Sequence, residues 1–189
     1  GPATRTDGKA ALAPTPGRRR PRETGRMASR NPVGPTLPIA ALLLAALSLA
    51  PSCAHLLQLR PRLAWPAMLW VDATVRGGLY AEFARVGGPV DVITVVVLGM
   101  LAWRERHAGD ALWLLWAFVG FVLALVALGA IVAPANSALA HWLATGVVTD
   151  FMAVSRRWEY GHVAIGLLKL AGMALLAVTL GRRAATAPR

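Results

Sequence analysis

The chain has 189 residues, of which 56% are hydrophobic and 15% are charged, and its formal net charge is +11. A soluble domain has about 25% charged residues, so this composition argues against an ordinary soluble protein. The apolar residues gather in four runs, which predicts an all-α integral membrane four-helix bundle of the up-and-down type. No basic face with interleaved aromatic residues is present, so the positive charge predicts membrane orientation and no nucleic-acid binding.

The first 36 residues are rich in Gly, Pro and Arg and contain eight basic and two acidic residues. Because such a segment cannot bury a core, we expect residues 1–36 to form a disordered basic tail. Met27 is a candidate natural start, which would make residues 1–26 an addition.

The first apolar run, residues 37–59, is long enough as a helix to cross the roughly 30 Å hydrocarbon core. Pro51 predicts a kink near its C-terminal end. A cleaved signal before Cys53 is an alternative, but Ala50-Pro51-Ser52 fits a lipoprotein signal poorly and three more runs follow. Cys53 is then a small packing residue.

The connector over residues 60–88 permits a short amphipathic helix in the membrane interface. The second run, residues 90–103, is too short to cross alone, so its helix should begin near Tyr80 and bend at Gly87-Gly88-Pro89. The third run, residues 111–133, should end at Pro134-Ala135-Asn136, with a mixed connector over residues 138–157. The fourth run is residues 163–180, so the membrane domain covers residues 37–181 and a basic tail covers residues 182–189.

The distribution of basic residues predicts the orientation. With both termini in the cytoplasm, 13 Lys and Arg residues lie on the inner side and 6 lie in the outer loops. We therefore expect a multi-pass protein of the cell membrane with both termini cytoplasmic and with membrane lipids as its surroundings. A homo-oligomer is a further candidate assembly.

This topology gathers polar side chains at the outer ends of the four spans. Glu159 and His162 share a face at the expected mouth of the fourth helix, and ionisable groups at membrane depth are functional candidates because their burial is costly. The candidate catalytic residues are His55, Asn136, Glu159 and His162, and the candidate binding residues are Gln58, Asp91, Trp158 and Lys169.

Structural interpretations stand beside this one. The same groups can cap helices or hydrogen-bond across the bundle, and Glu159 would suit a helix N-terminus. His55, Glu159 and His162 could also form a mononuclear metal site if their helices converge, although Glu-x-x-His occurs here only once and we predict no metal and no cofactor. Lys169 either extends to the interface or pairs inside the bundle.

Several other residues have simpler explanations. His107 and His141 are expected to be solvated loop residues, and Gly120, Gly166 and Gly172 to permit close helix packing. The tryptophans fit an interfacial belt: Trp65, Trp70, Trp103, Trp113, Trp142 and Trp158.

Four short motifs carry a family resemblance: Ala54-His55-Leu56-Leu57-Gln58-Leu59, Gly88-Pro89, Val132-Ala133-Pro134-Ala135-Asn136 and Arg157-Trp158-Glu159-Tyr160-Gly161-His162. In order and spacing they resemble the small four-span membrane family, largely a domain of unknown function, that includes the anthrone oxygenases. The resemblance implies a four-helix membrane bundle and, for some members, oxidation of an anthrone by molecular oxygen without flavin or haem. The family commonly has an arginine where this chain has Ile165, and Lys169 is a candidate substitute.

Two hypotheses for the function follow. The first is a cofactor-independent oxygenase or oxidoreductase acting on a lipophilic aromatic substrate, with His55 or His162 as general base. In that scheme Glu159 orients the imidazole, and Asn136 or Gln58 stabilises the oxyanion. The alternative is a non-enzymatic membrane protein that binds a lipid or a quinone, or a small subunit of a membrane complex.

Overall fold

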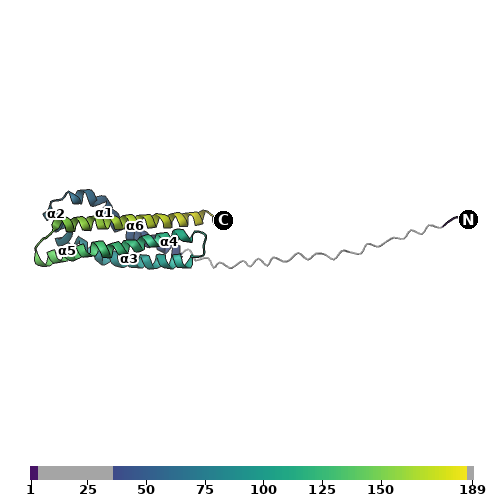
Figure 1. Cartoon of the computed structure of the whole chain (residues 1–189), viewed down its shortest axis with the longest axis horizontal. Helices are drawn as coiled ribbons and strands as arrows, with labels where there is room; N and C mark the ends of the chain where they lie inside the picture. The colour runs from purple at the N-terminus through teal and green to yellow at the C-terminus, as the bar shows by residue number, and fades with distance from the viewer. Residues whose placement is uncertain (4–35, 187–189) are drawn as a thin grey trace. The chain divides into compact units, whose positions relative to one another are not determined.

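The computed structural model describes residues 1–3 and 36–186, with the side chain of residue 79 excepted. The predicted N-terminal tail therefore lies almost entirely outside the described residues, as do the last three residues of the predicted C-terminal tail. In the described part, four helices are long and apolar enough to cross a membrane (Figure 1). The predicted all-α four-helix architecture is confirmed, as expected for a multi-pass membrane protein.

The first two spans match the expected runs with longer ends. Helix α1 covers Thr36–Leu63 and continues through Pro51 and Pro61. Helix α3 covers Leu79–Arg104, so its start agrees with the prediction to within one residue. Between them lie the short helix α2, Ala67–Val71, and the π-helical turn η1, Asp72–Arg76.

The third span runs on past the point where we expected it to end. It consists of α4, Ala111–Ala127, the π-helical segment η2, Leu128–Val132, and α5, Ala133–Thr145. Pro134 lies in the first turn of α5 and does not stop the helix. Proline removes a backbone donor, and Arg157 compensates by donating hydrogen bonds at 3.0 Å to the carbonyl oxygens of Ala130 and Ile131.

The fourth span, α6, covers Phe151–Ala185 and so begins twelve residues before the expected run. Glu159 and His162 consequently lie two to three turns inside the helix and not at its mouth, and the expected interaction of Glu159 with a helix N-terminus is wrong. Residues 151–157 belong to the expected connector, because Arg156 and Arg157 interrupt the apolar pattern there. Arg182 and Arg183 are helical as well.

The four spans form a ring in which α1 neighbours α3 and α6, and α4 also neighbours α3 and α6. The α4–α6 contact is close because glycines face each other: a Cβ on Gly120 would lie 3.3 Å from the Cα of Gly172, and one on Gly172 would lie 2.9 Å from Ala117 O. A Cβ on Gly166 would likewise lie 3.2 Å from Leu56. Small residues thus permit the helix packing that the sequence indicated.

Large apolar side chains remain on the outside of the bundle. On α1, Ile39, Leu43 and Leu47 are 54%, 65% and 57% exposed, and their spacing of four residues places them on one face. A continuous exposed apolar stripe of this kind is unfavourable in water. It is the surface that a membrane-spanning helix presents to lipid.

The tryptophan belt is only partly correct. Trp103 and Trp113 are exposed, but Trp70, Trp142 and Trp158 are buried in the core at 1–2% exposure. They are buried because α2 and η1 fold against the bundle, so that Trp70, Val71 and Val75 pack with Trp142 and Trp158 in one apolar cluster. The connector helix therefore covers the bundle on one face, while Met68 and Leu69 stay exposed on the other.

Candidate functional site

A cavity of about 560 Å³ lies among α1, α3, α6 and the η2–α5 segment. Its walls are mostly apolar, with Leu47, Pro51, Phe83, Leu128 and Ile165 among them. Six of the eight candidate site residues also line it: His55, Asp91, Asn136, Trp158, His162 and Lys169. A pocket of this volume is large enough for a small organic molecule.

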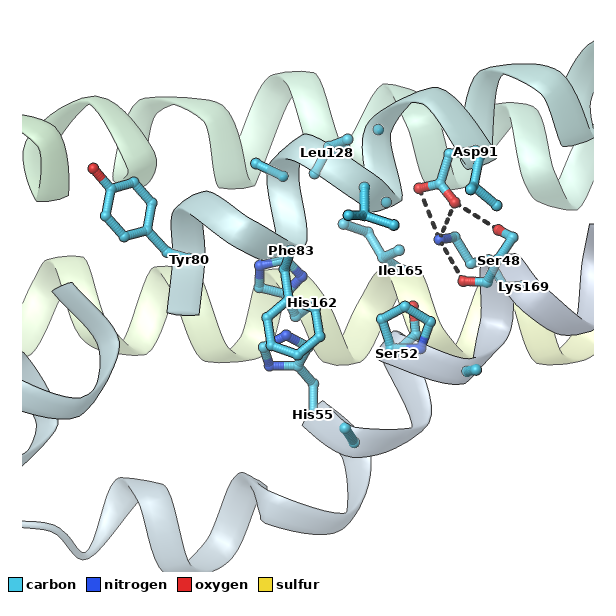
Figure 2. A pocket seen from close by; sticks show the side chains of 18 of the residues that line it. Ser48, Ser52, His55, Tyr80, Phe83, Asp91, Leu128, His162, Ile165 and Lys169 are labelled. Carbon is cyan, nitrogen blue, oxygen red and sulfur yellow. Dashed lines mark hydrogen bonds and ion pairs between the residues drawn. The ribbon is translucent and has the colours of Figure 1, made fainter. Parts of the chain in front are cut away.

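The two histidines meet face to face in the wall of this cavity. The ring centroids of His55 on α1 and His162 on α6 are 4.1 Å apart and the rings are within 6° of parallel. Trp158 packs edge-on against both, at 4.9 and 4.5 Å. Figure 2 shows the stacked rings beside Phe83. The predicted proximity of His55 to the fourth span is therefore present in the fold.

This pair has unused hydrogen-bonding capacity. Nδ1 of His55 is buried and has no hydrogen-bond partner in the described part of the chain. Two imidazolium rings at this separation would repel each other, which favours a pair carrying at most one positive charge. A neutral imidazole at the edge of an apolar cavity is a suitable general base.

A second polar group lines the cavity about two helical turns away. Nζ of Lys169 donates hydrogen bonds to both carboxylate oxygens of Asp91, at 2.7 and 2.8 Å, and to the carbonyl oxygen of Ser48 at 3.1 Å. The hydroxyl of Ser48 donates to Asp91 Oδ1 at 2.6 Å. The network joins α1, α3 and α6 (Figure 2). Lys169 therefore pairs inside the bundle and does not extend to the membrane interface.

Glu159 does not orient a histidine, contrary to our expectation. Its Oε1 accepts hydrogen bonds from Arg62 Nε at 2.6 Å and from Trp70 Nε1 at 2.8 Å, and the side chain is completely buried outside the cavity. Arg62 also donates to Thr74 at 2.6 Å. Glu159 is thus part of a cluster that fastens the α2–η1 segment to α6. Because it is committed there, the hypothetical three-ligand metal site with His55 and His162 is not assembled.

Of Gln58 and Asn136, only Asn136 lines the cavity. Gln58 is exposed and does not line the cavity; three residues beyond His55, it is turned about 60° away around the helix. Asn136 is half-buried in the cavity wall, and its Oδ1 accepts a hydrogen bond from Trp158 Nε1 at 2.9 Å. Its amide nitrogen remains a donor that an oxyanion in the cavity can use. His107 is exposed in the α3–α4 turn, as expected, whereas His141 is exposed but lies on helix α5 and not in a loop.

Sequence reasoning missed Arg62, Ser48 and Ser52, which are buried around the site at 4%, 1% and 4% exposure. A signal was present: Ser48, His55 and Arg62 follow one another at intervals of seven residues on α1, as His162 and Lys169 do on α6. A seven-residue interval keeps side chains on one face of a helix. Two such polar stripes on apolar helices predict a polar interior between them.

A third group of charges lies outside the cavity, where the α3–α4 turn meets the end of α6. Arg183 contacts Asp110 at 2.6 Å and Glu105 at 3.0 Å. The hydrogen bond from Arg183 holds the pKa of Asp110 below its usual value. These partly exposed charges link the α3–α4 turn to the C-terminal end of α6.

Comparison with known proteins adds no relative: no family model matches the sequence, and no curated protein or solved structure is significantly similar to it.

Proposed function

We propose that this chain is a cell-membrane protein that binds a lipophilic aromatic molecule in the cavity and oxidises it with molecular oxygen, using no flavin or haem. The observation that carries the proposal is the stacked pair of His55 and His162 in the wall of a mostly apolar cavity. The resemblance to the anthrone oxygenases supports the same class of substrate.

The proposed reaction needs only a base, an oxyanion donor and a dry pocket. The imidazole pair removes a proton from the CH₂ carbon of an anthrone, and the carbanion is stabilised as an enolate whose oxygen faces the amide of Asn136. The carbanion forms a C–O bond with O₂ to give a hydroperoxide, after protonation by the imidazolium. Loss of water from the hydroperoxide leaves the new carbonyl, so one O₂ is consumed and one water is released.

The test is turnover of anthrone by the purified protein in detergent, followed by quinone absorbance and oxygen uptake. We expect His162→Ala to reduce turnover by about 10²–10⁴-fold, the usual contribution of a general base. His141→Ala, which changes an exposed histidine on α5, is the matched control and should leave turnover unchanged.

Two results would count against the oxygenase. Wild-type turnover no faster than anthrone autoxidation in the same detergent would overturn it. Tight binding of an anthraquinone by a protein that does not turn over anthrone would instead support the alternative of a non-enzymatic lipid- or quinone-binding membrane protein.

The proposed orientation has both termini in the cytoplasm. The basic-residue count supports it, and the contact of Arg183 with Asp110 is consistent with the α3–α4 turn and the C-terminal end of α6 sharing one side. Reporter fusions at Gly109 and at the C-terminus should both report cytoplasm. A periplasmic signal at either position would overturn the orientation.

A further inference from the structure

The ion pair of Asp91 and Lys169 is the polar feature of the cavity that the proposed reaction does not use. Both residues line the cavity, and 12% of the Asp91 side chain stays exposed against 6% of Lys169. An ion pair that only joined helices would be expected to be shielded from the cavity. The question is therefore which hydrogen bonds the pair can still make.

Counting donors and acceptors answers it. A lysine ammonium has three N–H donors, and those of Lys169 are used by Asp91 Oδ1, Asp91 Oδ2 and Ser48 O. A carboxylate has about four lone-pair positions, and three of those on Asp91 are used, two by Lys169 and one by the Ser48 hydroxyl. The remaining capacity is an acceptor on Asp91.

We propose that Asp91 accepts a hydrogen bond from a hydroxyl group of the ligand, which makes the cavity selective for phenols over ethers and bare quinones. This inference rests on the proposed ligand-binding function and names its substrate class. A carbonyl or a carboxylate would find the donors of Lys169 and Ser48 already used, whereas a phenolic O–H meets a charged acceptor.

The spacing of the two polar groups sets the size of the ligand. His162 and Lys169 are seven residues apart on α6, as Ser48 and His55 are on the antiparallel α1. At 1.5 Å per residue the two levels are about 10 Å apart. A planar molecule of two or three fused rings fits between them, with its reacting carbon near the imidazoles and its hydroxyl near Asp91.

The test compares 2-hydroxyanthraquinone with 2-methoxyanthraquinone, which differ in the hydroxyl donor. Binding to the purified protein is measured by quenching of tryptophan fluorescence, and the readout is the ratio of the two dissociation constants. We expect wild type to prefer the hydroxyl probe by about tenfold or more, since hydrogen bonds to charged groups are the stronger kind.

Two variants separate the acceptor from its neighbours. In Asp91→Leu/Lys169→Met both charges go together, so no buried charge is left unpaired, and the ratio should fall to about one while the methoxy probe still binds. In Ser48→Ala a lone pair of Asp91 is released, so the preference should persist or increase. The control is Glu82→Leu/Arg85→Met, which removes an exposed ion pair from the same helix α3 and should keep the ratio of wild type.

Each outcome decides something. Equal binding of the two probes by wild type overturns the inference and leaves the proposed ligand function standing. A preference that survives Asp91→Leu/Lys169→Met, or that disappears in Ser48→Ala, also overturns it, because the hydroxyl is then recognised by another group. Binding of neither probe overturns the proposed ligand function, and this inference with it.

Discussion

Two buried ion pairs of similar geometry join the helices of this bundle, and their surroundings differ. Arg62 and Glu159 are 2.6 Å apart with side chains 4% and 0% exposed, while Lys169 and Asp91 are 2.7 Å apart with side chains 6% and 12% exposed. The first pair lies outside the cavity and the second lines it. The comparison teaches that access to the cavity, more than the ion pair itself, separates a structural group from a candidate binding group.

The Arg62–Glu159 pair, which lies outside the cavity, is surrounded by aromatic rings. The guanidinium of Arg62 lies 5.1, 5.6 and 5.3 Å from the rings of Trp65, Trp70 and Trp158, distances at which a cation is attracted to the face of a ring. Burial of both charges is costly, and their pairing offsets part of that cost, since Oε2 of Glu159 has no hydrogen-bond partner in the described part of the chain. We therefore assign this pair to folding, where it holds the α2–η1 segment in place.

The largest effect is expected for Glu159→Ala. It leaves Arg62 buried without its counter-charge, and removing one partner of a buried pair typically costs about 3–5 kcal/mol. Unfolding in mixed detergent micelles, followed by circular dichroism, measures the free energy.

The control for that experiment is Glu82→Ala, which breaks an exposed pair with Arg85 and should cost less than about 1 kcal/mol. Similar losses for the two variants would contradict the assignment of Glu159 to folding.

A smaller loss of stability is expected for Asp91→Asn, about 1–3 kcal/mol. The amide oxygen still accepts a hydrogen bond from Lys169, and the ammonium keeps its hydrogen bond to the carbonyl oxygen of Ser48. The second substitution in Asp91→Leu/Lys169→Met should restore part of this loss, because no unpaired charge remains. If Asp91→Asn costs as much as Glu159→Ala, the distinction between the two pairs fails.

The sequence predicted the four spans and the meeting of His55 with the fourth span because hydropathy and chain topology suffice for both. It did not predict where α6 begins, because Arg156 and Arg157 interrupt the apolar pattern. In the structure Arg157 lies inside α6 and donates hydrogen bonds to two backbone carbonyl groups of η2. Pro134 was misinterpreted for a related reason: a π-helical segment before a proline leaves no sequence signal of its own.

The site was predicted in part for a similar physical reason. Membrane level follows from the spans, so His55, Asn136 and His162 were placed together correctly. The direction of a side chain around its helix and its choice of partner depend on packing, which is why Gln58 turned out exposed and Glu159 turned out bound to Arg62. Asp91 was expected near the histidines and instead pairs with Lys169 deeper in the bundle.

Arg157→Met is expected to have an intermediate effect, because Arg157 is exposed yet donates to two carbonyl groups of η2. Losing both hydrogen bonds should lower the free energy of unfolding by about 1–2 kcal/mol. Arg156→Met changes the neighbouring exposed arginine and is the matched control, with an expected change within about 0.5 kcal/mol. Equal effects would mean that total charge, and not the contact with η2, determines stability here.

The smallest effect is expected for the partly exposed pair of Asp110 and Arg183, and it should depend on pH. Because the hydrogen bond from Arg183 lowers the pKa of Asp110 in the folded protein, the unfolded chain takes up the proton at a higher pH than the folded chain. The contribution of this pair is therefore complete above the ordinary carboxyl range and is lost as pH falls through the lowered pKa. In Asp110→Asn the free energy of unfolding should fall less between pH 5 and pH 3 than in wild type, by about 0.5–1 kcal/mol for a pair of this exposure. Asp150→Asn, which changes an exposed carboxylate beyond α5, should retain the wild-type dependence on pH. Identical acid sensitivity of all three proteins would show that this pair adds nothing to stability. Only the two buried pairs, Arg62–Glu159 and Lys169–Asp91, would then remain as ion pairs expected to stabilise the bundle.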